Sequence, residues 1–131
     1  DVGHLAARIA TQLSGGERAR ALLARALAVG APVLVVDEPL ASLDPGHQID
    51  VMELLAREAR AGALVIAVLH DLNLAARHCD RLLAIDQGRL VADGSPAEVL
   101  TDAMLRSIYG VTGYRAELDG MPLVIPLARS R

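Results

Sequence analysis

The sequence predicts an α/β protein built around a parallel sheet. Helix signals and strand signals alternate along its 131 residues, which is typical of that class. Two short apolar runs, at 33–36 and 63–69, have the character of strands buried on both faces of a parallel sheet. Hydrophobic residues make up 53% of the chain and aromatic residues only 2%, so we expect a closely packed aliphatic core.

The first helix is predicted from its capping residues. Ser14 and Glu17 have the spacing of a capping box, in which each side chain bonds the backbone N–H of the other residue. Gly30 and Pro32 should end this helix. The apolar strand VLVV follows and leads into acidic residues.

A helix between two strands is expected next. Asp44 followed by Pro45 marks the start of this helix, and Gly62 marks its end. One face of the helix should carry the apolar residues Ile49, Met52, Leu55 and Ala59. The run ALVIAVLH, at 63–70, then predicts the second buried strand.

The remaining sequence predicts short helices and two hairpins. The turns of the hairpins are expected at Gln87–Gly88 and Asp119–Gly120. The expected elements are a helix at 71–79, two strands within 81–94, a short helix capped by Ser95, Pro96 and Glu98, a helix at 101–109, and two strands within 114–127. No internal repeat or clear linker interrupts the chain, so we expect one domain.

The composition argues against several classes of protein. A formal net charge of -3 gives no electrostatic basis for binding nucleic acid. No apolar run approaches the roughly 20 residues that a membrane-spanning helix needs. Cys79 is the only cysteine, so no internal disulfide can form. All 13 basic residues are arginine, and the chain contains no lysine.

Polar residues stand at the ends of both predicted strands. Asp37 and Glu38 directly follow the first strand, and His70 ends the second. Parallel strands place their carboxyl ends at one edge of the sheet, where ligands bind. A carboxylate there can hold the Mg²⁺ of a nucleotide, and its neighbour can act on an attacking water. The alternatives are a polar turn after the first strand and a structural histidine after the second.

The stretch LSGGE has two interpretations. Ser14 and Glu17 can form a simple capping box, with Gly15 and Gly16 as a tight entry to the helix. The glycines can also expose backbone N–H groups at the positive end of the helix, which is a ready site for an anion. No metal-ligand spacing links the other histidines, which we expect at the surface or in packing: His4, His47 and His78.

Four motifs, in this order, resemble those of ATP-binding cassette (ABC) ATPases. LSGGE at 13–17 resembles the signature motif, VLVVDEP at 33–39 the Walker B motif, SLD at 42–44 the D-loop, and His70 the switch histidine. The resemblance covers nearly the whole chain. It implies the parallel-sheet core of a P-loop NTPase, with a helical segment that bears the signature motif and β-hairpins at the carboxyl end.

The same resemblance implies roles for the residues at the strand ends, with ATP and Mg²⁺ as cofactors. Asp37 would hold Mg²⁺, through water. Glu38 would be the catalytic base, and His70 would contact the γ-phosphate of ATP.

The resemblance also implies a head-to-tail dimer with a second ABC ATPase subunit. Ser14, Gly15, Gly16 and Glu17 would bind the ATP that the opposite subunit holds. Asp44, in the D-loop, would communicate across the dimer interface.

Two parts of the family pattern have no match. A Walker A loop, G-x-x-x-x-G-K-[ST], cannot be present because the chain has no lysine. The glutamine-bearing loop that would precede the signature motif is also unmatched. The opening DVGHLAARIAT reads as the continuation of a longer sequence. We therefore expect residues 1–131 to be a partial ABC ATPase domain, its carboxyl-terminal half, which alone hydrolyses no ATP.

The sequence around the motifs resembles that of the importer ATPases that energise uptake of iron-siderophore, haem or cobalamin. The run DEPLASLDPGHQIDVMELL and the ending YGV carry this similarity. It implies membrane permease subunits and, indirectly, a substrate-binding protein as partners, with the chain peripheral at the cytoplasmic face of the inner membrane.

Two alternatives from other classes remain. A soluble ABC ATPase acting on DNA or ribosomes would be supported by a basic stripe or a long coiled-coil insertion, and the sequence has neither. A catalytically silent cassette fragment that only binds a partner is the other alternative.

Overall fold

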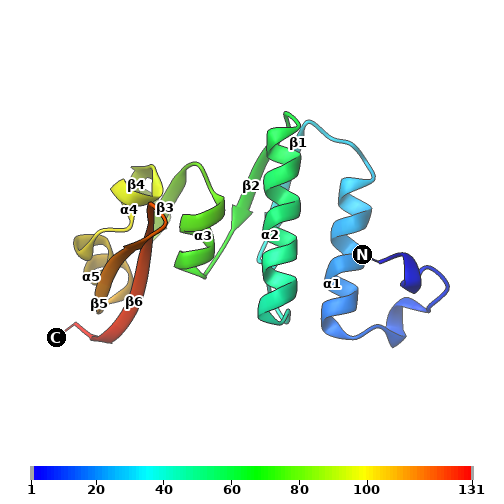
Figure 1. Ribbon diagram of the computed structural model, residues 1–131, viewed down its shortest axis with the longest axis horizontal. Helices are drawn as coiled ribbons and strands as arrows, with labels where there is room; N and C mark the ends of the chain where they lie inside the picture. Colours follow the sequence, from blue (N-terminus) through cyan, green and yellow to red (C-terminus); the bar gives the residue numbers. More distant parts are fainter. Residues whose placement is uncertain (1, 131) are drawn as a thin grey trace. The chain divides into compact units, whose positions relative to one another are not determined.

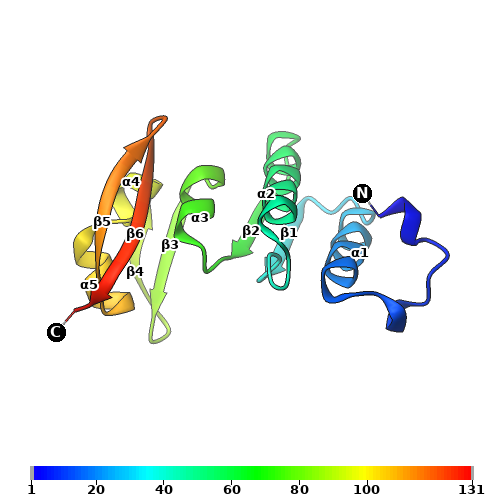
Figure 2. The same cartoon turned by 60° about the horizontal axis from the view of Figure 1, so that its bottom comes forward.

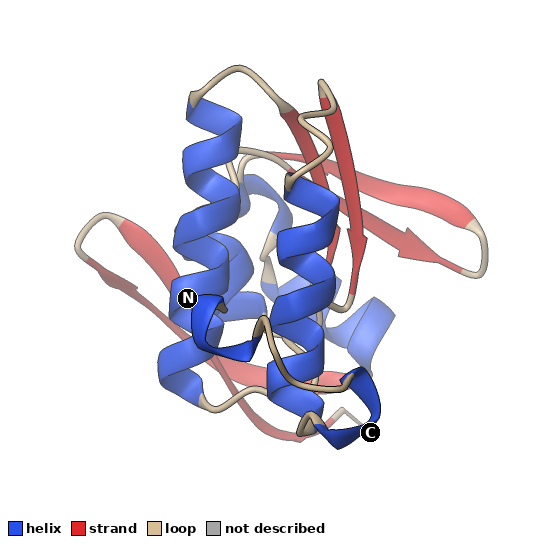
Figure 3. Ribbon diagram, turned by 90° about the vertical axis from the view of Figure 1, so that its right-hand side faces the viewer, coloured by secondary structure: helices blue, strands red, loops and turns tan. Residues whose placement is uncertain are grey.

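The computed structural model describes residues 2–130 of the chain. Contacts divide the chain into two compact units, Asp1–His70 and Asp71–Arg131, each with its own helices and strands (Figure 1). One strand pair is parallel and two are antiparallel, and helices accompany all of them (Figure 3). This mixture confirms the predicted α/β class.

The first unit contains two long helices and the parallel strand pair. Both helices begin at the predicted N-caps, Ser14 and Asp44, and Pro45 occupies the first turn of the second helix. In chain order the elements are the 3₁₀ helices Gly3–Leu5 and Ala10–Gln12, α1 (Gly15–Leu27), β1 (Val33–Asp37), α2 (Pro45–Arg60) and β2 (Leu64–Val68).

The elements β1, α2 and β2 form a strand–helix–strand unit. The strands pair in parallel and in register, from Val33 opposite Leu64 to Asp37 opposite Val68. Parallel strands cannot be joined by a tight turn, and α2 supplies the crossover between them. The buried side chains of α2 are Val51, Met52 and Leu55. The carboxyl ends of both strands therefore lie at the same edge.

One face of this strand pair is exposed, which corrects the prediction of strands buried on both faces. Side chains alternate along each strand between exposed and half-buried. The exposed apolar side chains, at 46% to 66% of full accessibility, are Val33, Val35, Leu64, Ile66 and Val68. Ile49, predicted on the buried face of α2, is also 40% exposed. An apolar run indicates that a face can be buried but does not supply the segment that would cover it.

The second unit contains two hairpins and three short helices (Figure 2). Both predicted turns are confirmed, because Gln87–Gly88 and Asp119–Gly120 join antiparallel strands and all four residues have positive φ. The elements are α3 (Leu72–His78), β3 (Leu82–Asp86), β4 (Arg89–Gly94), α4 (Pro96–Val99), α5 (Asp102–Tyr109), β5 (Val111–Leu118) and β6 (Met121–Arg129). Within residues 2–130, no helix is long and apolar enough to span a membrane.

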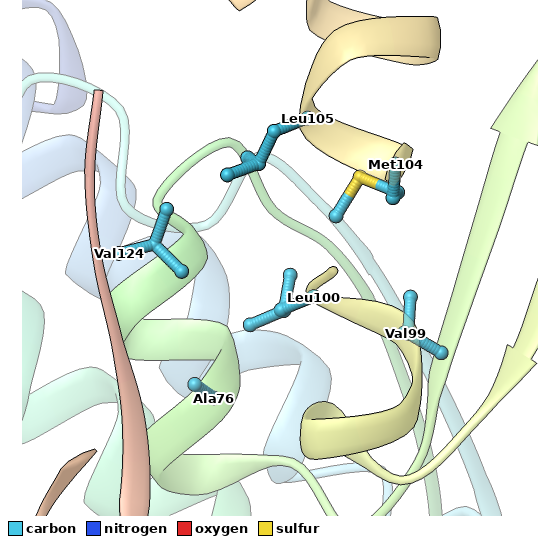
Figure 4. Packing of buried hydrophobic residues seen from close by; sticks show 6 residues of the cluster. All are labelled: Ala76, Val99, Leu100, Met104, Leu105 and Val124. Atoms are coloured by element: carbon cyan, nitrogen blue, oxygen red, sulfur yellow. The ribbon is translucent and has the colours of Figure 1, made fainter. Parts of the chain in front are cut away.

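A cluster of apolar side chains forms the core of the second unit (Figure 4). Leu100, Leu105 and Val124 are almost completely buried, at 1% accessibility or less. The members of the cluster are Ala76, Val99, Leu100, Met104, Leu105 and Val124. None of them is aromatic, which confirms the predicted aliphatic core.

The side-chain amide of Asn73 ties α3 to β6. Its Nδ2 donates to the carbonyl of Val124 at 3.1 Å, and its Oδ1 accepts from the N–H of Val124 at 2.8 Å. Both backbone groups of Val124 therefore point away from β5. Pro122 and Pro126 lie two residues before and two residues after Val124 in β6. Because backbone groups two residues apart in a strand point to the same side, the nitrogens of both prolines also point away from β5. The missing N–H of each proline thus removes no bond to β5.

We predict that Asn73→Ala lowers the free energy of unfolding of the chain by about 2 kcal/mol, because both backbone groups of the buried Val124 lose their partners. Urea denaturation of the 131-residue chain measures the effect. Ser107→Ala is the control, since it removes one long hydrogen bond of 3.4 Å in α5. If both variants lost the same free energy of unfolding, the two hydrogen bonds between Asn73 and Val124 would not have the importance assigned to them.

Candidate functional site

The predicted strand-end residues Glu38 and His70 meet in the structure. Glu38 directly follows β1, and its backbone N–H donates to the carbonyl of Val68, the last residue of β2, at 3.2 Å. His70 lies two residues beyond β2. Its Nε2 lies 2.9 Å from Glu38 Oε1. The parallel register thus brings together two side chains that are 32 positions apart in the sequence.

The geometry of this pair leaves Glu38 able to accept a second proton donor. An ionised carboxylate can only accept, so His70 Nε2 donates to Oε1. The second oxygen, Oε2, has no hydrogen bond within the described chain. The side chains of His70 and Glu38 are 76% and 54% exposed, so the bond contributes little to stability. Glu38 also has φ 46°, a left-handed conformation that costs a non-glycine residue about 1 kcal/mol.

Asp37 offers a free carboxylate beside this pair. It is the last residue of β1 and is exposed, and among residues 2–130 its side chain makes no hydrogen bond or ion pair. Mg²⁺ is usually bound by one or two carboxylates together with waters and phosphate oxygens. Asp37 therefore fits a magnesium ion that arrives with a nucleotide. The described residues contain no cluster of three or more metal-binding side chains that would hold an ion without one.

The start of α1 is the predicted capping box. The N–H of Ser14 donates to Glu17 Oε2 at 2.8 Å, and the N–H of Glu17 donates to Ser14 Oγ at 3.3 Å. The bond from the Ser14 backbone lowers the pKa of Glu17, with a smaller contribution from the Ser14 hydroxyl. Arg8 Nη1 also lies 3.2 Å from Glu17 Oε1. Glu17 is therefore engaged within its own chain.

The two glycines of α1 lie against the loop between β1 and α2. A Cβ built on Gly15 would be 3.5 Å from Ser42 Cβ. A Cβ built on Gly16 would be 3.3 Å from Leu43 Cδ2 and 3.4 Å from the carbonyl oxygen of Ser42, which is tighter than ordinary contact. The structure thus brings the LSGGE and SLD motifs of one chain together.

Asp44 caps α2 and carries a partner that the sequence did not predict. Its Oδ1 accepts from the N–H of His47 at 3.1 Å, and its Oδ2 lies 2.5 Å from His47 Nδ1. The bond to the His47 ring, followed by the backbone bond, lowers the pKa of Asp44. His47 was expected only at the surface or in packing. The signal that could have identified it is its position three residues after an N-cap aspartate.

The structure groups the candidate residues into two sets. Glu38 and His70 are bonded at the strand ends, with Asp37 adjacent in the chain. The second set contains Ser14, Gly15, Gly16, Glu17 and Asp44, gathered where α1 and α2 begin. No hydrogen bond or ion pair joins the two sets within the described residues. Of the other histidines, His4 is exposed and His78 is half-buried.

The sequence is similar to ATP-binding proteins of transporters. The sequence model of the ABC transporter family matches residues 1–41. The chain is 55% identical to the hemin import ATP-binding protein HmuV of Bordetella avium (strain 197N), over 92% of this chain and 48% of that protein. It is 49% identical to the protein of that name in Nocardia farcinica (strain IFM 10152), over 97% and 45%. The chain thus spans about half the length of the curated relatives it matches.

Solved structures give the same fold. One, described as a metal-chelate type ABC transporter in an inward-facing conformation, aligns with a TM-score of 0.81 and 27% identity over 95% of this chain and 52% of that chain. Another is a dimeric ATP-binding cassette in a post-hydrolysis state, bound to ADP and Pi. It aligns with a TM-score of 0.61 and 33% identity over 66% and 37%.

We predict that ionised Asp44 continues to cap α2 at a lower pH than an aspartate with an ordinary pKa would. A depressed folded pKa means that ionised Asp44 stabilises α2 above its unfolded pKa of about 3.9, and that this stabilisation is lost as the pH falls through the lower folded pKa. His47→Ala should raise the pKa of Asp44 toward its ordinary value.

A ¹³C NMR titration of the side-chain carboxyl carbons measures this change. Asp93 is the internal control, because its pKa is lowered by Arg81 and should not respond to His47→Ala. An unchanged midpoint for Asp44 would contradict the assigned cause.

Proposed function

The chain belongs to the ABC transporter ATPases. From this premise we propose that it forms one half of an importer ATPase that hydrolyses ATP, namely the half that carries the catalytic glutamate and the signature motif. The observation that carries the proposal is the 2.9 Å bond between Glu38 and His70 at the ends of two paired parallel strands. A general base needs an oxygen within hydrogen-bond reach of the attacking water and a fixed orientation. The His70 bond supports that orientation while Oε2 remains available.

In this proposal Glu38 accepts the proton of the attacking water. Its exposed side chain can meet a nucleotide that approaches the edge of the sheet. His70 holds Oε1 in the free chain and contacts the γ-phosphate when ATP is bound. Asp37 holds Mg²⁺, directly or through water, and the ion supplies positive charge that offsets the phosphate charge.

The second set of residues acts on a different nucleotide in this proposal. Ser14, Gly15 and Gly16 stand at the amino end of a 13-residue helix, where backbone N–H groups and the helix dipole favour an anion. The anion is the γ-phosphate of an ATP that the opposite subunit holds, and Asp44 lies in the same interface. The dimeric cassette among the similar structures supports this assembly.

The transported solute is proposed to be an iron chelate, haem or cobalamin. The relatives from Bordetella avium and Nocardia farcinica are named for hemin import, which supports haem among the three. Membrane permease subunits and a substrate-binding protein complete the system, and the ATPase is peripheral at the cytoplasmic face of the inner membrane. The 131 residues alone have no lysine for a Walker A loop, so we propose that they hydrolyse no ATP without the rest of a cassette.

We predict that Glu38→Gln, in a complete cassette containing these residues, lowers the steady-state ATPase rate by at least about 100-fold. The amide is nearly the same size as the carboxylate but cannot accept the proton of water. ATP binding to the monomer should remain within about twofold, and a dimer with trapped ATP should accumulate. Phosphate release and size-exclusion chromatography measure the two effects. Turnover close to that of the unmodified cassette would remove Glu38 from the role of base.

A second prediction separates anion binding from capping at LSGGE. Ser14→Arg should leave the first ATP bound by the monomer but block ATP-driven dimerisation, because the side chain fills the space of the partner's phosphate. Ser14→Ala is the matched control: it removes the cap, worth about 1 kcal/mol, without filling that space. Both are measured in the Glu38→Gln background. If both variants dimerise normally and only lose thermal stability, LSGGE is a capping box alone.

A further inference from the structure

The loop between β1 and α2 is held by the side chain of Gln48. Gln48 lies in the first turns of α2, and its Nε2 donates to the carbonyl of Leu43 at 3.2 Å and to that of Leu40 at 3.5 Å. These hydrogen bonds are partly buried, and Leu40 itself is only 9% exposed. One neutral side chain thus bridges two carbonyls of the loop from the helix that follows it.

The loop needs such support because its own backbone is irregular. Ser42 has φ 63°, a left-handed conformation that is unfavourable for a serine. Within the loop, the N–H of Leu43 donates to the carbonyl of Leu40 at 3.3 Å, and that of Ala41 to the carbonyl of Glu38 at 3.1 Å. Gln48 adds the tertiary contacts that fix these turns to α2.

The same loop is the surface on which the start of α1 lies. The positions for a Cβ on Gly15 and Gly16 are 3.3 Å to 3.8 Å from atoms of Ser42 and Leu43. A side chain added at either glycine would therefore meet the loop, and a loop displaced toward α1 would leave less room at the start of that helix. The loop and the LSGGE turn are therefore close neighbours, and the placement of one limits the placement of the other.

We propose that Gln48 is a positioning residue for the ATPase: it fixes the loop at 40–44 and, through that loop, aligns the LSGGE turn and Asp44 for the opposite subunit. This inference rests on the proposed function of those residues. Gln48 touches no nucleotide in this scheme, and its amide is required because it donates to both carbonyls. A glutamate in its place would set a carboxylate against two carbonyl oxygens.

The test uses Gln48→Glu in the complete cassette, with Gln87→Glu as the matched control. Gln87 is exposed in the β3–β4 turn, in the other compact unit of the chain, and it receives the same change of side chain. We expect Gln48→Glu to lower ATP-driven dimerisation and turnover by about ten- to hundredfold, while ATP affinity of the monomer stays within about twofold. Gln48→Lys keeps a donor at this position and should recover most of the loss.

A readout independent of activity accompanies these measurements. Amide hydrogen exchange at Ala41 and Leu43, whose N–H groups are bonded within the loop, should accelerate in Gln48→Glu and stay unchanged in Gln87→Glu. Turnover and dimerisation equal to the Gln87→Glu control would overturn the proposal, as would a parallel fall in monomer ATP affinity, which indicates general unfolding. The Glu38→Gln variant tests the proposed function separately. If that function were wrong, Glu38→Gln would leave turnover intact, whatever the effect of Gln48→Glu on turnover and dimerisation.

Discussion

The in-register parallel pairing of β1 with β2 is the constraint on which the rest of the candidate site depends. It runs over five residue pairs and ends with Asp37 opposite Val68. A shift by one residue would turn the side chains of one strand to the other face and separate the two strand ends. The helix between the strands makes this pairing possible, since it returns the chain to the edge where it began. Glu38 and His70 are neighbours because of that return, and their surface hydrogen bond follows from the pairing and does not create it.

The second set of residues depends on a different kind of order, which is local. Ser14 and Asp44 each cap a helix with their own side chain. The capping-box bonds to Ser14 lower the pKa of Glu17, and the bond to the His47 ring, followed by the capping bond, lowers that of Asp44. Such bonds span three residues and form wherever the helix starts. What is not local is the proximity of Gly15 and Gly16 to the loop before α2. Absence of a side chain at both positions allows two helix starts to approach each other closely.

This division explains how much of the fold and of the site the sequence could predict. Caps and positive-φ turns are short-range features, so the starts of α1 and α2 and the turns at Gln87–Gly88 and Asp119–Gly120 were predictable. Proximity of Glu38 and His70 followed from the general geometry of parallel strands. The partner of Asn73 could not be predicted, because it lies 51 residues away in the sequence. The bridge from Gln48 spans only five and eight residues, but it depends on the irregular path of the loop, which no sequence pattern specifies. The exposed face of β1 and β2 was missed because an apolar run does not record what covers it.

The edge of β6 has a consequence for how this chain behaves when concentrated or newly synthesised. An open strand edge is a template for adding further strands, and long apolar hairpins are prone to cross-β growth. Along β6, an incoming strand would meet the nitrogens of Pro122 and Pro126, which have no hydrogen to donate, and between them the N–H and carbonyl of Val124, already bonded to Asn73. That edge is therefore a poor seed for aggregation, although its hairpin carries exposed Tyr114, Ile125 and Leu127.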